Sequence, residues 1–291
     1  MEMGVRVRGS WNIFWNGKQG SRMKLIKNTV CLLKDIYKDR RLLMDLSAKD
    51  VQRRFSGTYF GMVWGFLQPL MTIIVYWAVF QFGFRSGDVG DTPFVLWFVT
   101  GIICWLFISE SFSFASNSLL EYSYLIQKVK FNVNILPLVK ILSSFYIHLF
   151  FLFIVMIICT LFGYGPTVYT IQLPYYMAAT VILVFGLSLL TSSIMVFFRD
   201  LNQIISILLL LGMWGTPIAW DLEGFLPEGQ RILKLNPFYY LVEGYRDALL
   251  GRRWFTQRLE LGIYFWLATT LILLIGIHFY TKLKPHFADT V

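Results

Sequence analysis

Charged residues are scarce in this sequence. They make up 15% of its 291 residues, whereas a soluble domain carries about 25%. The evenly spaced short strands of alternating polarity that a membrane barrel requires are also absent. Hydrophobic residues instead make up 56% of the chain, and aromatic residues make up 18%. These features exclude an ordinary soluble domain and predict an all-α polytopic membrane protein, because backbone groups in lipid must be satisfied within each segment.

Motifs for nucleotide and metal chemistry are missing as well. The sequence has no G-x-x-x-x-G-K-[ST] phosphate loop and no H-E-x-x-H zinc motif. Its three cysteines are scattered, and His148 lies in an apolar run, where we expect a packed polar side chain. We therefore expect no enzyme activity, cofactor, metal or nucleic-acid partner. A secretory signal is not expected either, because the first apolar run starts only at residue 61.

Six apolar runs approach the ~20 residues that a helix needs to cross the hydrocarbon layer. They are Gly61–Phe84, Pro93–Phe114, Leu136–Phe162, Pro174–Phe198, Leu201–Trp220 and Glu260–Thr281. The sequence FFRDLN at residues 197–202 interrupts the apolar character between the fourth and fifth runs and predicts a tight hairpin there. The predicted fold is thus a bundle of six transmembrane helices.

The distribution of charge predicts the orientation of these helices. Residues 1–60 contain thirteen Lys and Arg residues against five Asp and Glu residues, which places this end in the cytoplasm. Six crossings return the C-terminal tail, residues 284–291, to the same side. The predicted outer loop at residues 221–259 carries six Lys and Arg residues. It is an exception to the positive-inside rule, by which Lys and Arg gather in cytoplasmic loops. We expect this loop to have a special structure.

An amphipathic helix is predicted after a cytoplasmic tail of residues 1–31 and before the first apolar run, over residues 32–56. One face of it is apolar: Leu32, Leu33, Ile36, Tyr37, Leu43, Met44, Val51 and Phe55. The opposite face is mainly basic, as suits a helix lying in the membrane interface near anionic headgroups. A soluble helix packed on its own protein is the alternative.

Two short helices are predicted in the last outer loop, near Pro227–Leu235 and Pro237–Leu250. Prolines open them and Gly251 closes the second. Neither is long enough to cross the membrane, so we expect a re-entrant hairpin over residues 221–251 that is buried in protein or lines a wet cavity. Glu243, Arg246 and Asp247 are spaced for pairing along the second helix. The alternative is an amphipathic loop lying flat on the outer surface.

Several stretches resemble the membrane subunit of ABC-2 type polysaccharide exporters, which are type V ABC exporters. They are RRFSGTYFGMVWGFLQPL, TPFVLWFVTGIICWLFISES, FFRDLNQI, GTPIAW and LNPFYYLVEGYRDALLG, within residues 45–283. A pair Phe60-Gly61 stands where the family commonly has Leu-Gly. The resemblance implies a transmembrane domain over residues 57–283 in the bacterial cytoplasmic membrane. It also implies a homodimer bound to two cytoplasmic ATPase subunits, which hold Mg-ATP.

The substrate implied by this resemblance is a polymer linked to polyprenyl pyrophosphate. Teichoic acid is our first expectation, followed by O-antigen, capsule or another wall glycan. Two other classes remain open. One is an ABC-2 permease for a drug or a simple lipid, and the other is a membrane-embedded transferase.

The resemblance also assigns roles to residues. A coupling helix that docks on the ATPase corresponds to residues 117–131, and its candidates are Leu119, Leu120, Glu121, Tyr122, Tyr124 and Leu125. Candidates for the cytoplasmic substrate entrance are Arg53, Arg54, Tyr59, Phe60 and Gly61. Aromatic candidates for the channel wall are Trp64, Phe66, Tyr76, Trp77, Phe80, Trp97, Trp105 and Phe107. The outer re-entrant lid would comprise Pro237, Phe238, Tyr239, Tyr240, Glu243, Tyr245 and Arg246.

Two ionisable residues lie within predicted spans. Glu110 is near the inner end of the second span, and Lys140 opens the third. Charges at such depth are costly unless they are paired or face water. We therefore predict a direct contact between Glu110 and Lys140.

Overall fold

The structure is a computed structural model that describes residues 29–56, 59–61, 63–83, 87–128, 132–222 and 226–287. Regular structure in these ranges is helical, and an isolated bridge pairs Val89 with Thr92. Five helical segments within them are long and apolar enough to cross a membrane. The predicted all-helical membrane fold is therefore confirmed. Most of the predicted N-terminal tail and the last four residues lie outside the described ranges.

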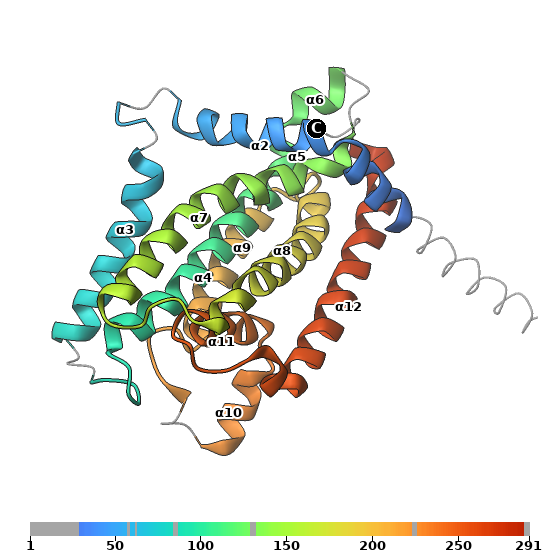
Figure 1. Ribbon diagram of the computed structural model, residues 1–291. Coiled ribbons are helices and arrows are strands. Elements are labelled where there is room, and N and C mark those ends of the chain that lie inside the picture. The colour runs from blue at the N-terminus through green and yellow to red at the C-terminus, as the bar shows by residue number, and fades with distance from the viewer. Residues whose placement is uncertain are drawn as a thin grey trace, which may run out of the picture.

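The five long segments agree closely with five of the predicted spans. They are α3 (Val63–Ala78) with its π-helical continuation η1 (Val79–Gly83), α4 (Phe94–Ser116), η2 (Val133–Ile135) with α7 (Leu136–Leu161), η3 (Val168–Gln172) with α8 (Leu173–Met195), and η5 (Phe255–Arg258) with α12 (Leu259–Leu283) and η6 (Lys284–His286). Helix α4 is the centre of the bundle and contacts α7, α8 and α9. No residue of α3 is buried, so this helix stands at the edge (Figure 1).

The fifth predicted span, Leu201–Trp220, is a shorter helix than expected. Helix α9 (Leu201–Gly215) has 15 residues, which corresponds to about 22 Å at 1.5 Å per residue. The hydrocarbon layer is about 30 Å thick. Thr216 leaves the helix with an extended backbone, as the residue before a proline tends to do.

Helix α2 (Arg40–Phe55) and a preceding helical stretch at residues 29–38 lie across one end of the bundle, which we call the inner end (Figure 1). Leu43 of α2 packs on Ile135 and Val139 near the start of α7. Leu33 and Met44, which were predicted on the same apolar face, are exposed. The amphipathic helix thus uses part of its apolar surface to bind its own bundle and leaves part uncovered.

Two short helices and the C-terminal end share the inner end with α2. They are α5 (Ser118–Glu121) and α6 (Ser123–Lys128), between α4 and α7. Helix η6 is joined to the bundle by Lys284, whose Nζ donates to Asn134 Oδ1 at 3.0 Å. Helices α2 and η6 therefore lie at the same end of the bundle.

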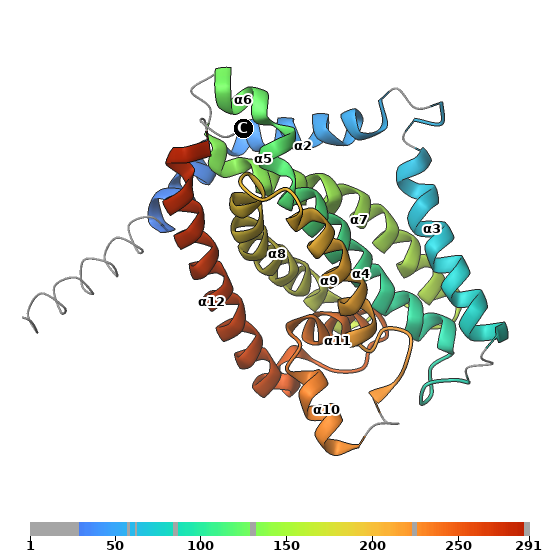
Figure 2. The ribbon, with the colours of Figure 1, turned by 180° about the vertical axis from the view of Figure 1, so that it is seen from behind.

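Helices α10 (Pro227–Lys234) and α11 (Pro237–Leu249) lie at the opposite, outer end (Figures 1 and 2). Both begin and end within one residue of the prediction. The side chain of Asn236 caps α11 by accepting from the amide of Phe238 at 3.0 Å. Gly251 follows with φ of +68°, a conformation that favours glycine. Helix α11 packs among α4, α8 and α12, whereas α10 has no buried residue.

We expect Gly276→Ala to destabilise the bundle. Helices α8 and α12 approach closely at Gly186 and Gly276, and a Cβ on Gly276 would overlap the carbonyl oxygen of Gly186. Overpacking of this kind costs about 1–3 kcal/mol. The midpoint of thermal unfolding in detergent should fall by several degrees. Gly215→Ala is the control, because a Cβ there meets nothing within 4 Å, and equal midpoints for the two variants would contradict the close approach.

Candidate functional site

Five charged side chains meet where α2 crosses the bundle, and we call them the inner network: Asp50, Arg54, Glu110, Glu121 and Lys140. Lys140 Nζ lies 2.7 Å from Asp50 Oδ1 and 2.7 Å from Glu121 Oε1. Arg54 Nε lies 3.2 Å from Asp50 Oδ2, and Arg54 Nη1 lies 2.8 Å from Glu110 Oε1. These ion pairs join α2, α4, α5 and α7.

The centre of the inner network is removed from water. The side chains of Asp50 and Lys140 are each 1% exposed, and the hydroxyl of Tyr122 donates to Asp50 Oδ1 at 2.7 Å. Burial raises the pKa of Asp50, but the hydrogen bond and charge of Lys140, the Tyr122 hydroxyl and the charge of Arg54 outweigh burial and hold this pKa below its ordinary value. Asp50 is therefore a carboxylate at neutral pH and the anchor of the network.

The predicted direct pair between Glu110 and Lys140 is wrong. Glu110 is paired with Arg54 of α2 instead, and Lys140 is paired with Asp50 of the same helix. The Arg54 guanidinium also donates to the backbone oxygen of Lys140 at 3.3 Å and to Ser144 Oγ at 3.2 Å. Sequence alone does not place α2 on α7. The available signal was the one-turn spacing of Asp50 and Arg54, which favours pairing on one helix face.

The predicted coupling segment, residues 117–131, consists of α5 and α6, and residues 129–131 lie outside the described ranges. Its predicted docking residues differ in burial. Leu119 and Tyr122 are buried, Leu120 and Leu125 are half-buried, and Tyr124 is 46% exposed. Part of the segment's apolar character therefore anchors it to the bundle. Tyr124 is left on the surface, next to the guanidinium of Arg53 at 5.9 Å from its ring centre.

The residues predicted for the substrate entrance separate into two groups. Arg54 is 9% exposed and belongs to the inner network, so its charge is already paired. Arg53 is exposed beside Tyr122 and Tyr124. Tyr59 and Phe60 are 100% and 58% exposed, and Gly61 has φ of +52° in the turn before α3. Arg53 and the turn are therefore accessible to a substrate, whereas Arg54 is not.

The predicted channel aromatics separate in the same way. Trp97, Trp105 and Phe107 of α4 are at most 3% exposed, because Arg246 covers Trp97, Phe238 packs on Trp105, and His148 stacks on Phe107. These three cannot line a channel along the surface of this protomer. The others are on α3 and η1 and are exposed or half-buried: Trp64, Phe66, Tyr76, Trp77 and Phe80.

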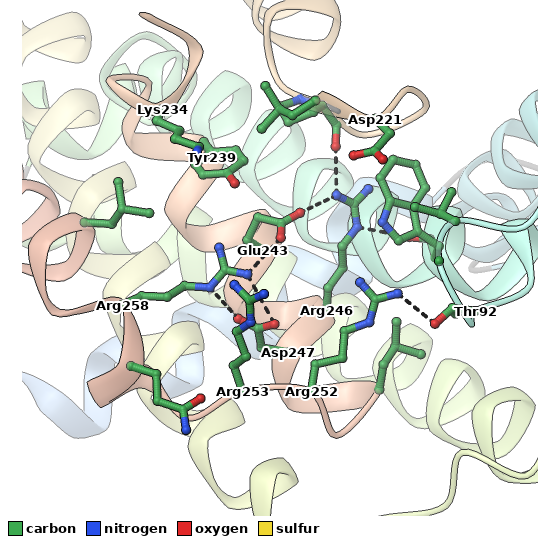
Figure 3. Close-up of a pocket in the computed structure, with 18 of the residues that line it drawn as sticks. Thr92, Asp221, Lys234, Tyr239, Glu243, Arg246, Asp247, Arg252, Arg253 and Arg258 are labelled. Carbon is green, nitrogen blue, oxygen red and sulfur yellow. Dashed lines mark hydrogen bonds and ion pairs between the residues drawn. The ribbon is translucent and has the colours of Figure 1, made fainter. Parts of the chain in front are cut away.

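The outer end contains a second group of buried charges, the outer cluster: Glu243, Arg246, Asp247 and Arg258 (Figure 3). Arg246 is fully buried. Its guanidinium donates to the backbone oxygens of Trp97, Pro217 and Ile218 at 3.1, 2.8 and 2.8 Å. It also donates to Glu243 Oε1 at 2.6 Å. Because these acceptors come from α4, α11 and the segment after α9, Arg246 joins all three.

Arg258 completes the outer cluster from η5. Its Nη2 lies 3.1 Å from Glu243 Oε2, and its Nε lies 2.7 Å from Asp247 Oδ2. Burial raises the pKa of Glu243, but the charges of Arg246 and Arg258 outweigh it, so this pKa lies below its ordinary value. Burial raises the pKa of Asp247 to about 6, against the lowering effect of Arg258. The predicted pairing of Glu243 with Arg246 is confirmed, and sequence reasoning missed Arg258.

The remaining predicted lid residues pack α11 into the bundle. Tyr245 is buried, and its hydroxyl lies 3.0 Å from His148 Nε2. His148 is thus a packed polar side chain, as predicted. The Tyr240 hydroxyl lies 3.0 Å from that of Tyr175. Pro237 opens the helix, Phe238 contacts Trp105, and Tyr239 is buried beside the outer cluster.

A cavity of about 1000 Å³, the outer cavity, lies above the outer cluster. Its wall is built by the 89–92 turn, the segment after α9, α10, η5 and the start of α12. Arg252 is fixed on this wall by donating to the Thr92 hydroxyl at 2.7 Å (Figure 3). The cavity is polar, and paired charges form its floor.

These features define a helical membrane protein with one ion-paired cluster at each end of its bundle. Residues 41–250 match the ABC-2 type transporter family. The chain belongs to this family, and it is therefore a membrane subunit of a transporter. The resemblance to ABC-2 type exporters stated from the sequence is confirmed.

Curated relatives are similar over most of their length. The O-antigen export system permease protein RfbA of Myxococcus xanthus is 26% identical over 224 residues, which are 76% of this chain and 85% of that protein. The protein of the same name from Klebsiella pneumoniae is 26% identical over 254 residues, which are 85% of this chain and 94% of that protein.

We expect Lys140→Met to destabilise the protein strongly. The substitution leaves Asp50 buried without its closest cation, and breaking a buried pair in this way costs about 3–5 kcal/mol. Lys49→Met is the matched control, because Lys49 is an exposed cation of the same helix as Asp50. Thermal unfolding of the purified protein measures both variants. Asp50→Asn combined with Lys140→Met should recover part of the loss, and equal midpoints for Lys140→Met and Lys49→Met would refute the buried pair.

Proposed function

We propose that this protein is the permease subunit of an exporter of lipid-linked cell-surface polysaccharide, with an O-antigen-type polymer as its substrate. The observation that carries this proposal is the match, over 85% and 94% of their lengths, to two permeases named for O-antigen export. The comparisons give no support to teichoic acid, our first expectation from the sequence. They do not favour a drug, simple-lipid or transferase function either.

A second copy of the chain would complete the transport path beside α3. A hollow of about 580 Å³ runs along this helix and is lined by Trp64, Leu67, Gln68, Met71, Thr72, Val75 and Tyr76. Gln68 is exposed in the second turn of α3, and polar side chains at membrane depth usually face protein or water rather than lipid. Aromatic rings on the same face suit a sliding saccharide. This supports a homodimer in which α3 borders the channel for the polyprenyl-pyrophosphate-linked polymer.

The energy source would be a cytoplasmic ABC ATPase that binds at α5 and α6, one ATPase for each copy of the chain. Tyr124 offers an exposed aromatic anchor, and the inner network connects this segment to α2, α4 and α7. Mg-ATP would be held by the ATPase. In this arrangement the inner end, with α2 and η6, would face the cytoplasm, and both termini of the chain would lie on that side of the membrane.

The remaining elements fit a protein of the bacterial cytoplasmic membrane with six crossings. Helix α9 would be the short fifth crossing. Helix α2 and the preceding stretch at residues 29–38 would lie at the inner headgroups, with Met44 and Leu33 toward lipid. Helices α10 and α11 would form a re-entrant outer lid. The burial of α11 and the exposure of α10 support a lid with a fixed inner and a free outer part.

We expect Tyr124→Ala to weaken binding of the ATPase about thirtyfold, because truncating an aromatic anchor of an interface costs about 2 kcal/mol. The amount of ATPase that copurifies with the permease should fall accordingly. Glu121 is less suitable as a probe, since it is paired with Lys140. Tyr37→Ala is the matched control, because Tyr37 is a 69% exposed tyrosine from the same end of the protein. Equal ATPase retention by the two variants would argue against docking at α6.

Export itself is tested in cells depleted of this protein. The lipid-linked glycan should accumulate inside the cell, and the corresponding surface polysaccharide should disappear. The purified complex should hydrolyse ATP faster in the presence of the polyprenyl-linked glycan. Stimulation by small hydrophobic drugs instead, with normal surface polysaccharide in depleted cells, would favour the drug or lipid permease. Turnover of substrate without any ATPase subunit would favour the transferase.

A further inference from the structure

The outer cavity has a set of charges outside the ion pairs of the bundle. Its floor is the outer cluster, in which Arg246 and Arg258 are paired with Glu243 and Asp247. Its wall carries three further cations and three further carboxylates: Lys234, Arg252, Arg253, Asp91, Asp221 and Glu260. No ion pair with another described residue involves any of these six side chains. They are exposed or half-buried, so they can reach a ligand.

The wall is also electrically balanced. The charges of the paired acids and bases in the floor cancel, and the wall carries as many carboxylates as cations, three of each. Figure 3 shows Lys234 and Asp221 on one side of the outer cluster and Arg252 and Arg253 on the other. Hydroxyl and amide groups of Tyr164 and Gln257 also line the cavity. Donors and acceptors therefore both line a space without a net charge.

We propose that the outer cavity binds an uncharged saccharide segment of the exported polymer. This inference rests on the proposed function and specifies the chemistry of its substrate. A neutral sugar presents many hydroxyls, each of which donates to a carboxylate and accepts from a guanidinium or an ammonium. Hydrogen bonds to charged groups are about twice as strong as those between neutral groups. A volume of about 1000 Å³ lies at the upper end of the usual range for ligand sites, about 300–1,000 Å³.

A polyanion such as a chain of glycerol phosphates fits this cavity less well. Each phosphate would have to approach Asp91, Asp221 or Glu260 as well as the cations, and juxtaposed like charges cost several kcal/mol. A polyanion site would carry an excess of Lys and Arg, which this wall does not have. The cavity therefore discriminates by charge between two classes of cell-surface polymer.

The floor makes the cavity a preformed site. Arg246 is held by three backbone oxygens and Glu243, and a Cβ on Gly101 would meet its guanidinium at 2.6 Å, so the side chain fills the space available. Arg252 is fixed by Thr92. A ligand therefore meets a wall whose base is already ordered, which reduces the entropy lost on binding.

Protection of a cysteine tests the proposal in the full permease–ATPase complex in lipid nanodiscs. Cys31→Ser removes the exposed native thiol, while Cys104 and Cys159 are buried. Thr256→Cys then places an exposed thiol on the cavity wall. Val168→Cys is the matched control, because Val168 belongs to the outer helix η3, is 69% exposed and does not line the cavity. The probes are neutral oligosaccharides of mannose, galactose and rhamnose, and oligo(glycerol phosphate).

We expect at least one neutral oligosaccharide to slow maleimide labelling of the Thr256→Cys protein about threefold at twice its Kd. The Val168→Cys protein should be labelled at an unchanged rate, and oligo(glycerol phosphate) should protect neither. Asp91→Asn combined with Asp221→Asn gives the wall an excess of positive charge. In that background, protection by the neutral oligosaccharide should weaken and protection by oligo(glycerol phosphate) should appear.

Two outcomes would overturn this inference: no protection by any neutral oligosaccharide, or equal protection of the unaltered wall by oligo(glycerol phosphate). The depletion experiment tests the proposed function separately. If depleted cells accumulate the lipid-linked glycan and the cavity shows no protection, the saccharide site is refuted and the export function stands. If depleted cells keep their surface polysaccharide, the export function is refuted whatever the cavity binds.

Discussion

A charge removed from water has to bring counter-charges or backbone acceptors with it, and both ends of this protein are organised around that constraint. At the inner end, Lys140 draws carboxylates from α2 and α5 onto α7. At the outer end, Arg246 donates hydrogen bonds to backbone oxygens of α4 and of the segment after α9. Neither α2 nor α11 can leave the bundle without stranding a buried charge. Charge pairing thus fixes the position of both elements in addition to apolar contact.

Helix α4 connects the two clusters. Its inner part carries Glu110, which is bound to Arg54, and its outer part provides the Trp97 carbonyl and ring that hold Arg246. The same helix continues into α5 through Asn117. A displacement of α5 can therefore be transmitted to α11 along this continuous, buried helix. Helix α3, by contrast, touches the bundle lightly and has no buried residue, so it is free to adapt to whatever covers it.

Elements with local signals could be predicted from the sequence. Prolines and Gly251 define α10 and α11 within a few residues, and the Glu243–Arg246 pair follows from helical spacing. Contacts between segments that are distant in the sequence could not be predicted. Arg258 reaches the outer cluster through a loop, and α2 reaches Lys140 across 90 residues of sequence. The aromatic residues of α4 were misplaced for a different reason: the helix is apolar on all sides, so no periodicity indicates which side chains are buried. The early end of α9 did have a local signal, Pro217, which the predicted span to Trp220 passed over.

The early end of α9 has a consequence for the surrounding bilayer. A helix of 15 residues falls about 8 Å short of the hydrocarbon thickness. Ile207, Leu211 and Trp214 on this helix are more than 45% exposed. Hydrophobic mismatch of this size is relieved by local thinning of the membrane. If α9 is the proposed fifth crossing, lipid beside it would be compressed, and a headgroup crossing there would travel a shorter distance through hydrocarbon.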